Sequence, residues 1–335
     1  MKRNMDSWVK NVIASDKRLA MPIITYPGLA LTGNTVLEFV KSGKKQFECI
    51  RALAEKYDSI AAVTVMDLSA EAECFGSQVR FSENEIPTVI GKIVSDEESI
   101  SALAVPKPGA FRTAEYLIST ELAASAIADR PVFGGMIGPF SLAGRLFDIT
   151  EIMMEMMLEP EMIKALVAKA AEFLQAYAQA FKDAGANGII VAEPAAGLLS
   201  PEKSAEFSYE YLKKIIAAVQ DDSFIFILHN CGNTKNQVKF MQSTGARGLH
   251  FGNAVDMTLI LPQVRSDMLA FGNIDPVKVI KLGSPNDVRR SVRELLDKTA
   301  EYPNFVLSTG CDTPPASPLE NIDAFFESVY DYNNR

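Results

Sequence analysis

The sequence predicts a single (β/α)8 barrel over its 335 residues. Eight short runs rich in apolar and β-branched residues recur along the chain, and most are nearly continuous, as is typical of parallel strands buried on both faces. Segments with a helical period of 3.6 residues lie between them. This alternation favours a closed barrel, and the lack of a G-x-G-x-x-G motif after the first strand argues against an open doubly wound sheet.

The order of the elements follows from the same patterns. Ser-Pro pairs followed by an acidic residue, at Ser200-Pro201 and Ser284-Pro285, mark helix starts, because proline and negative charge both favour the first turn. The expected helices include 161–184, 201–219, 277–280 and 285–302. The expected strands are 21–28, 59–67, 131–139, 188–194, 224–230, 246–253, 268–275 and 304–311.

We expect one domain covering residues 1–335, with an N-terminal helix within 1–20. The segment 68–130 is longer than one helix needs and carries several prolines and charges. It predicts an excursion over the top of the barrel, containing a small hairpin and followed by a helix from about residue 113. No repeat of solenoid period and no low-complexity tract interrupts the chain.

Composition restricts the classes of function. A formal net charge of −9 argues against a nucleic-acid partner, because no excess of Lys and Arg could neutralise phosphates. There is no run of about 18 uncharged apolar residues and no signal-peptide pattern, so we expect neither a membrane span nor export. Four scattered cysteines do not form a disulfide framework. The expected location is the cytoplasm, where a functional thiol is a metal ligand or a nucleophile.

Polar residues at the strand ends are the candidate site residues, because all carboxyl ends of a barrel open into one basin. His229 and Cys231 end the fifth predicted strand and Cys311 ends the eighth, so the two loops can converge although ~80 residues separate them. The full set of candidates at the strand ends is Asp67, Glu193, His229, Cys231, His250, Asn253, Asn273, Asp275 and Cys311.

One histidine and two cysteines make a nitrogen and sulfur ligand set that zinc favours. Three protein ligands would leave one position open, which is typical of a catalytic zinc site. The alternative is that the cysteines are small buried apolar residues, and this is our interpretation of Cys49 and Cys74. Asn273 and Asp275 are expected to shape a turn. The methionine run at 152–162 is typical of core packing or of an oligomer surface, which leaves a homo-oligomer open.

Several blocks of this sequence resemble the zinc-dependent corrinoid:thiol methyltransferases, that is, the methylcobalamin:coenzyme M methyltransferases of the uroporphyrinogen decarboxylase superfamily. The most specific blocks are "HNCGNT" (229–234), "GNIDP" (272–276) and "STGCDTPPASPLENI" (308–322). Further blocks in the same order are "DLSAEAECFGSQVRFSENEIP" (67–87), "KPGAFR" (107–112), "GPFSLAG" (138–144) and "AEPAAGLLSPE" (192–202). The resemblance covers nearly the whole chain and implies a (β/α)8 barrel with zinc held by His229, Cys231 and Cys311.

The resemblance also implies a reaction: transfer of a methyl group from a methylated corrinoid, carried by a small partner protein, to a thiol such as coenzyme M. Two thiolates and a neutral imidazole leave Zn²⁺ formally uncharged, so an added substrate thiolate would keep electron density on its sulfur. A His/Cys2 zinc also activates water in nucleotide deaminases, but their H-x-E and P-C-x-x-C pattern is absent.

Other polar residues have open roles. Glu193 could be the fourth ligand, could orient His229, or could simply bind loop amides. His250 could bind substrate or corrinoid, or be a structural imidazole. Asp67 and Asn253 are expected to line the substrate pocket.

Two arginines complete the set of candidates. Arg112 and Arg145 could hold an anionic tail of the substrate or corrinoid, or lie on a solvated surface.

Two rival functions stay open. Uroporphyrinogen decarboxylation would need an arginine-rich stretch after the first strand to hold many carboxylates, yet residues 25–39 contain no Arg or Lys. A non-catalytic zinc- or corrinoid-binding protein is the other alternative.

Overall fold

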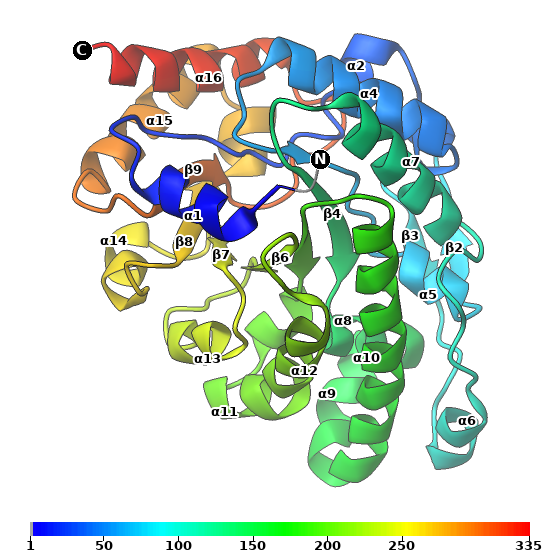
Figure 1. Cartoon of the computed structure of the whole chain (residues 1–335). Coiled ribbons are helices and arrows are strands. Elements are labelled where there is room, and N and C mark those ends of the chain that lie inside the picture. The colour runs from blue at the N-terminus through cyan, green and yellow to red at the C-terminus, as the bar shows by residue number, and fades with distance from the viewer. Residues whose placement is uncertain (1–2) are drawn as a thin grey trace.

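The structure, a computed structural model describing residues 3–335, contains a parallel sheet ordered β1-β4-β5-β6-β7-β8-β9 (Figure 1). Its strands are β1 (Ala62–Val63), β4 (Val132–Ile137), β5 (Gly188–Ala192), β6 (Ile225–Asn230), β7 (Gly248–Phe251), β8 (Leu269–Ile274) and β9 (Phe305–Thr309). The extended residues 19–23 close the circle, because Met21 N donates to the Leu307 carbonyl and Ile60 N donates to the Ala20 carbonyl. The predicted barrel is therefore confirmed.

Helices surround this sheet (Figure 1). The longer ones are α1 (Met5–Ile13), α4 (Gly43–Lys56), α7 (Thr113–Ala126), α8 (Pro139–Phe147), α9 (Ile149–Leu158), α10 (Pro160–Asp183), α12 (Glu210–Val219), α15 (Pro285–Lys298) and α16 (Leu319–Asn333). The shorter ones are α2 (Leu29–Thr32), α3 (Val36–Val40), α5 (Ala70–Cys74), α6 (Glu97–Ala102), η1 (Pro194–Leu198), α11 (Pro201–Ser204), η2 (Ala205–Tyr209), α13 (Val238–Ser243), α14 (Met257–Ile260), η3 (Leu261–Gln263) and η4 (Pro276–Lys281).

Some predicted boundaries are wrong. The first strand ends near Ile24 rather than at residue 28, because residues 25–28 form a turn. Helix α15 ends at Lys298 rather than at 302, where a further turn leads into β9. In the segment 68–130, β2 (Gln78–Arg80) pairs antiparallel with β3 (Thr88–Ile90), which is the expected hairpin.

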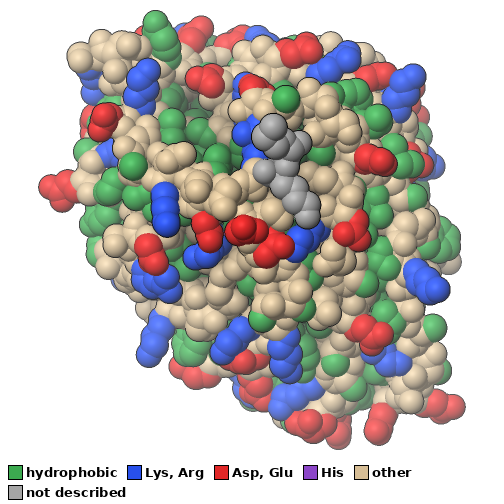
Figure 2. Space-filling view, viewed as in Figure 1, with side chains coloured by type: hydrophobic (Ala, Val, Ile, Leu, Met, Phe, Trp, Pro, Cys, Tyr) green, Lys and Arg blue, Asp and Glu red, His purple; other side chains and the backbone are tan. Residues whose placement is uncertain are grey.

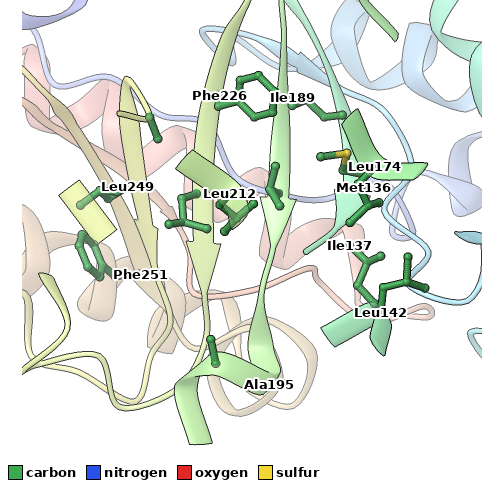
Figure 3. Packing of buried hydrophobic residues seen from close by; sticks show 14 of the residues in the cluster. Met136, Ile137, Leu142, Leu174, Ile189, Ala195, Leu212, Phe226, Leu249 and Phe251 are labelled. Carbon is green, nitrogen blue, oxygen red and sulfur yellow. The ribbon is translucent and has the colours of Figure 1, made fainter. Parts of the chain in front are cut away.

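The core has two layers, one on each face of the sheet. Inside the barrel, residues such as Ile190, Ile227 and Phe271 form one apolar cluster. On the outer face, alternate residues such as Ile189, Phe226 and Leu249 pack against the surrounding helices (Figure 3). Because successive side chains of a strand point to opposite faces, this assignment fixes which strand-end residues face the barrel interior.

Helix α16 packs beside α4 and ties the end of the chain to the start of the barrel (Figure 1). The rings of Tyr57 and Phe326 stack with centroids 4.7 Å apart, and Lys56 Nζ lies 2.6 Å from Asp323 Oδ1. Acidic and basic side chains are interspersed over the face in Figure 2. Over residues 3–335, no helix combines the length and the apolar character that crossing a bilayer would require.

Candidate metal centre

His229 faces the barrel interior because of its place in β6. Ile225 and Ile227 belong to the interior cluster, and His229 continues the same alternation. The imidazole is 2% exposed. Its Nε2 atom is buried without a hydrogen-bond partner within residues 3–335. A buried, unpartnered nitrogen is costly unless a ligand satisfies it.

Cys231 is held in place by the turn after β6. The Asn230 Oδ1 atom accepts a hydrogen bond of 2.9 Å from Gly232 N, while its amide nitrogen donates to the Tyr209 hydroxyl at 3.3 Å. The next loop packs so closely that a Cβ atom on Gly252 would lie 2.5 Å from Cys231 Cα. Only glycine permits this approach, which fixes the backbone that carries the thiol.

Cys311 is positioned in the same way by the loop after β9. Gly310 N donates to the Ile274 carbonyl at 2.7 Å, and Thr313 N donates to the Ile23 carbonyl at 2.9 Å. The backbone that carries the Cys311 thiol is therefore held on both sides, by hydrogen bonds to β8 and to the first strand.

The structure brings the three predicted metal ligands together. One potential ligand atom from each of His229, Cys231 and Cys311 lies within 4.8 Å of the other two. The histidine is buried and both cysteines are half-buried, so the group is partly accessible. Two sulfurs, one imidazole nitrogen and an accessible side are the donor set of a catalytic zinc site, and these residues fit such an ion.

The thiols of Cys231 and Cys311 differ in pKa because each affects the ionisation of the other. The Cys311 thiol, followed by His229, lowers the pKa of Cys231 below its ordinary value, and the Cys231 sulfur in turn raises the pKa of Cys311. By contrast, burial raises the pKa of Cys49 to about 12. Burial is also the main cause that raises the pKa of Cys74. Of these four thiols, Cys231 is therefore the one whose surroundings favour thiolate.

Glu193 lies outside this group of ligands. Ile190 and Ala192 face the barrel interior, so the next residue points to the other side, toward the start of α8. Its Oε1 atom accepts hydrogen bonds from Phe140 N at 3.0 Å, Ser141 N at 3.1 Å and the Ser208 hydroxyl at 3.0 Å. Burial raises the pKa of this carboxyl to about 8. The arrangement matches the expected alternative of a strand-end carboxylate bound to amides.

Asp67 and Arg112 form a buried ion pair rather than two separate binding groups. The guanidinium contacts the Asp67 carboxylate, lies 2.6 Å from Glu73 Oε2 and donates to Ser69 Oγ at 2.8 Å. The Tyr116 hydroxyl donates to the same aspartate at 2.8 Å. The charge of Arg112 is therefore largely satisfied within the chain.

The remaining predicted residues are exposed or half-buried. Arg145, on α8, and Asn253 are exposed. The Asn253 amide donates to Asp275 Oδ2 at 3.0 Å, and Asp275 also accepts from Val277 N and Lys278 N at the start of η4. Asn273 donates to two loop carbonyls.

Three further residues lie close to the ligands: His250, whose role the sequence left open, and Ser308 and Asp312, which were not predicted. His250 is 0% exposed and lies behind His229, with its Nδ1 atom 2.8 Å from His229 Nδ1. Ser308, which binds His250, was not singled out from the sequence. Asp312 was also missed, although it directly follows Cys311; both of its carboxylate oxygens are buried without a partner in the described chain.

Fold and site define a class: a (β/α)8 barrel with a nitrogen and sulfur metal-ligand group at the carboxyl ends of its strands. The chain belongs to the uroporphyrinogen decarboxylase (URO-D) family, whose model matches residues 19–332. The predicted family is thereby confirmed.

Relatives of two kinds share this family. A methylcobamide:CoM methyltransferase, MtbA, of Methanosarcina acetivorans is 28% identical over 93% of this chain and 94% of its own. A uroporphyrinogen decarboxylase of Alcanivorax borkumensis is 25% identical over 84% of this chain and 81% of its own. Among solved structures, a methyltransferase from Methanosarcina mazei superposes with a TM-score of 0.87, at 21% identity, over 98% of this chain and 99% of its own.

Proposed function

We propose that this protein is an enzyme that transfers a methyl group from a methylated corrinoid to a thiol, at a zinc ion held by His229, Cys231 and Cys311. The observation that carries the proposal is the convergence of these three ligand atoms within 4.8 Å of one another. The similarity to methylcobamide:CoM methyltransferases over nearly the full length supports the same reaction class.

The ligand residues suit an acceptor thiol. Zinc bound there would lower the pKa of the acceptor thiol, so that its sulfur is a thiolate at neutral pH. Two thiolate ligands and one neutral imidazole would leave Zn²⁺ formally uncharged. The ion would therefore withdraw little electron density from the acceptor sulfur. The half-buried positions of Cys231 and Cys311 leave the acceptor a direction of approach.

The proposed reaction balances as follows. The acceptor thiol loses its proton, and its sulfur forms a bond to the methyl carbon. The cobalt–carbon bond breaks with its electron pair left on cobalt, so methyl-cobalt(III) becomes cobalt(I). The donor is a methylcorrinoid carried by a partner protein, and the products are a thioether, the cobalt(I) corrinoid and a proton released to solvent.

We assign the other residues to supporting roles. Glu193, bound to the first amides of α8, stabilises the start of that helix. Asp67, paired with Arg112, shapes the neighbouring pocket wall. Asn253 and Arg145 are exposed, and we assign Arg145 to an anionic group of the corrinoid or the acceptor.

A methylcobalamin assay with a panel of thiols tests the proposal. Demethylation is followed by the cobalamin spectrum, and zinc is measured in the purified protein. We expect about one zinc per chain, thiol-dependent demethylation and loss of both in His229→Ala. No turnover with any thiol, or a variant as active as the parent, would contradict the proposal. Zinc-free protein that decarboxylates uroporphyrinogen would favour the rival function instead.

A further inference from the structure

Both histidines of the chain belong to one buried series of hydrogen bonds that starts at the candidate ligand. His229 Nδ1 lies 2.8 Å from His250 Nδ1, and His250 Nε2 lies 2.9 Å from Ser308 Oγ. Ser308 Oγ lies 2.7 Å from the Met21 carbonyl oxygen. The side chains of His229, His250 and Ser308 are at most 2% exposed, so solvent offers no competing partners.

The alternation of side chains along the strands brings the members of this hydrogen-bond series together. His229 and His250 are register partners on the neighbouring strands β6 and β7. Ser308 follows the interior residue Val306 by two positions on β9, and Met21 itself belongs to the interior cluster. All four residues therefore face the inside of the barrel, and the hydrogen bonds cross it from β6 to the first strand.

The chemistry of the last acceptor fixes every proton in the series. A carbonyl oxygen can only accept, so the Ser308 hydroxyl donates its single proton to Met21. The hydroxyl must then accept from His250, whose Nε2 therefore carries a proton. A neutral His250 has a bare Nδ1, which accepts the Nδ1 proton of His229. In His229, the bare nitrogen is consequently Nε2.

We propose that His250, supported by Ser308, is a positioning residue that holds His229 in the tautomer with its proton on Nδ1. This inference rests on the proposed metal centre. The tautomer leaves the His229 Nε2 lone pair free for a metal ion, and that atom is buried without a hydrogen-bond partner in the described chain.

The use of an imidazole for this task has a consequence for charge. Metal-binding histidines usually donate their second nitrogen to a carboxylate, a backbone carbonyl or water. A carboxylate would add a negative charge beside two thiolate ligands. A neutral His250, packed nearly parallel to Phe271 with ring centroids 6.3 Å apart, orients His229 without adding that charge.

Metal affinity of matched variants tests the role of His250. In His250→Phe an apolar ring fills the space but offers no acceptor to His229. We expect zinc affinity, measured by competition with a chelator at fixed pH, to fall by about 10–100-fold. In His250→Asn, the Oδ1 atom is bonded to Cγ, as Nδ1 is in histidine. This oxygen can accept the proton of His229, so the variant should restore most of the affinity. Ser308→Ala should give a smaller loss, because His250 keeps its acceptor nitrogen.

Nitrogen NMR of the metal-free protein reads the tautomer directly. The chain has only two histidines, so ¹⁵N-histidine labelling gives two imidazoles in the parent and only His229 in the position-250 variants. We expect His229 Nε2 to resonate as an unprotonated nitrogen in the parent and in His250→Asn, and to gain proton-bearing character in His250→Phe.

The outcomes are distinguishable. A parent protein with a protonated His229 Nε2 overturns the inference without any variant, and so does a His250→Phe protein that binds zinc as tightly as the parent. If His250→Phe does not fold, the parent spectrum and the graded affinities of His250→Asn and Ser308→Ala decide. A parent that binds no zinc would instead remove the proposed function itself.

Discussion

The carboxylate of Glu193 occupies the space in front of Gly138, where any other residue would place its Cβ atom. An ideal Cβ on Gly138 would lie 1.5 Å from Glu193 Oε2. The glycine therefore lets a buried side chain reach the first amides of α8, which starts the helix beside the candidate metal centre.

Gly138→Ala should destabilise the protein by about 2–4 kcal/mol, because the new methyl group must displace a hydrogen-bonded, buried carboxyl. Urea unfolding of the purified variant measures the change. Gly144→Ala, within α8, is the matched control, since its Cβ would make one close contact, 2.8 Å from the terminal Cδ1 atom of Ile149, and otherwise only ordinary contacts. Equal stability of the two variants would contradict this account.

The pH dependence of stability should change in Glu193→Gln. Burial raises the pKa of Glu193 to about 8, from 4.5 for an exposed glutamate. The stability that this group contributes is complete below about pH 4.5 and is lost as pH rises through about 8, because the unfolded chain releases the proton first. The glutamine variant lacks this loss.

We therefore expect Glu193→Gln to gain stability relative to the parent, by on the order of 4 kcal/mol between pH 4.5 and pH 8.5. Urea unfolding of metal-free protein at both pH values gives the comparison. Glu202→Gln, at an exposed position, controls for general charge effects. A difference between parent and Glu193→Gln that does not vary with pH would show that the carboxyl ionises normally.

Arg112→Met should cost about 3–5 kcal/mol, because it leaves the buried Asp67 carboxylate without its cation. The double variant Asp67→Asn/Arg112→Met should be destabilised by less than the sum of the single variants, since the two residues interact. Unfolding in urea measures all three. A stable Arg112→Met protein with only a raised KM for the corrinoid would instead return Arg112 to a substrate-binding role.

Alanine variants of the four cysteines should differ in whether they retain zinc. Cys231→Ala and Cys311→Ala should lose bound zinc, because two protein ligands rarely hold the ion. Cys49→Ala and Cys74→Ala should keep it, because both thiols are buried away from the candidate ligands. Elemental analysis after gel filtration separates the pairs, and zinc retained in Cys311→Ala would exclude the proposed ligand set.

Much of the barrel and its ligand group could be predicted from local patterns. Continuous apolar runs identified the strands, and His229 and Cys231 were placed at a strand end by the run that precedes them. Closure of the barrel then made Cys311 a neighbour, because loops at one end of a barrel share a basin. Strand boundaries do not follow from these runs, since hydrogen bonding decides where a strand ends, as in the turn at residues 25–28.

The sequence by itself determined the strand and helix alternation and the ligands available to a metal. Only the tertiary structure decided that His250 lies behind His229, that Glu193 binds the amides of α8 and that Arg112 forms an ion pair with Asp67. The physical reason lies in the strands, which are buried on both faces. Their apolar runs carry no alternation to mark the inner side, so the direction of each strand-end residue is set by packing across the whole barrel.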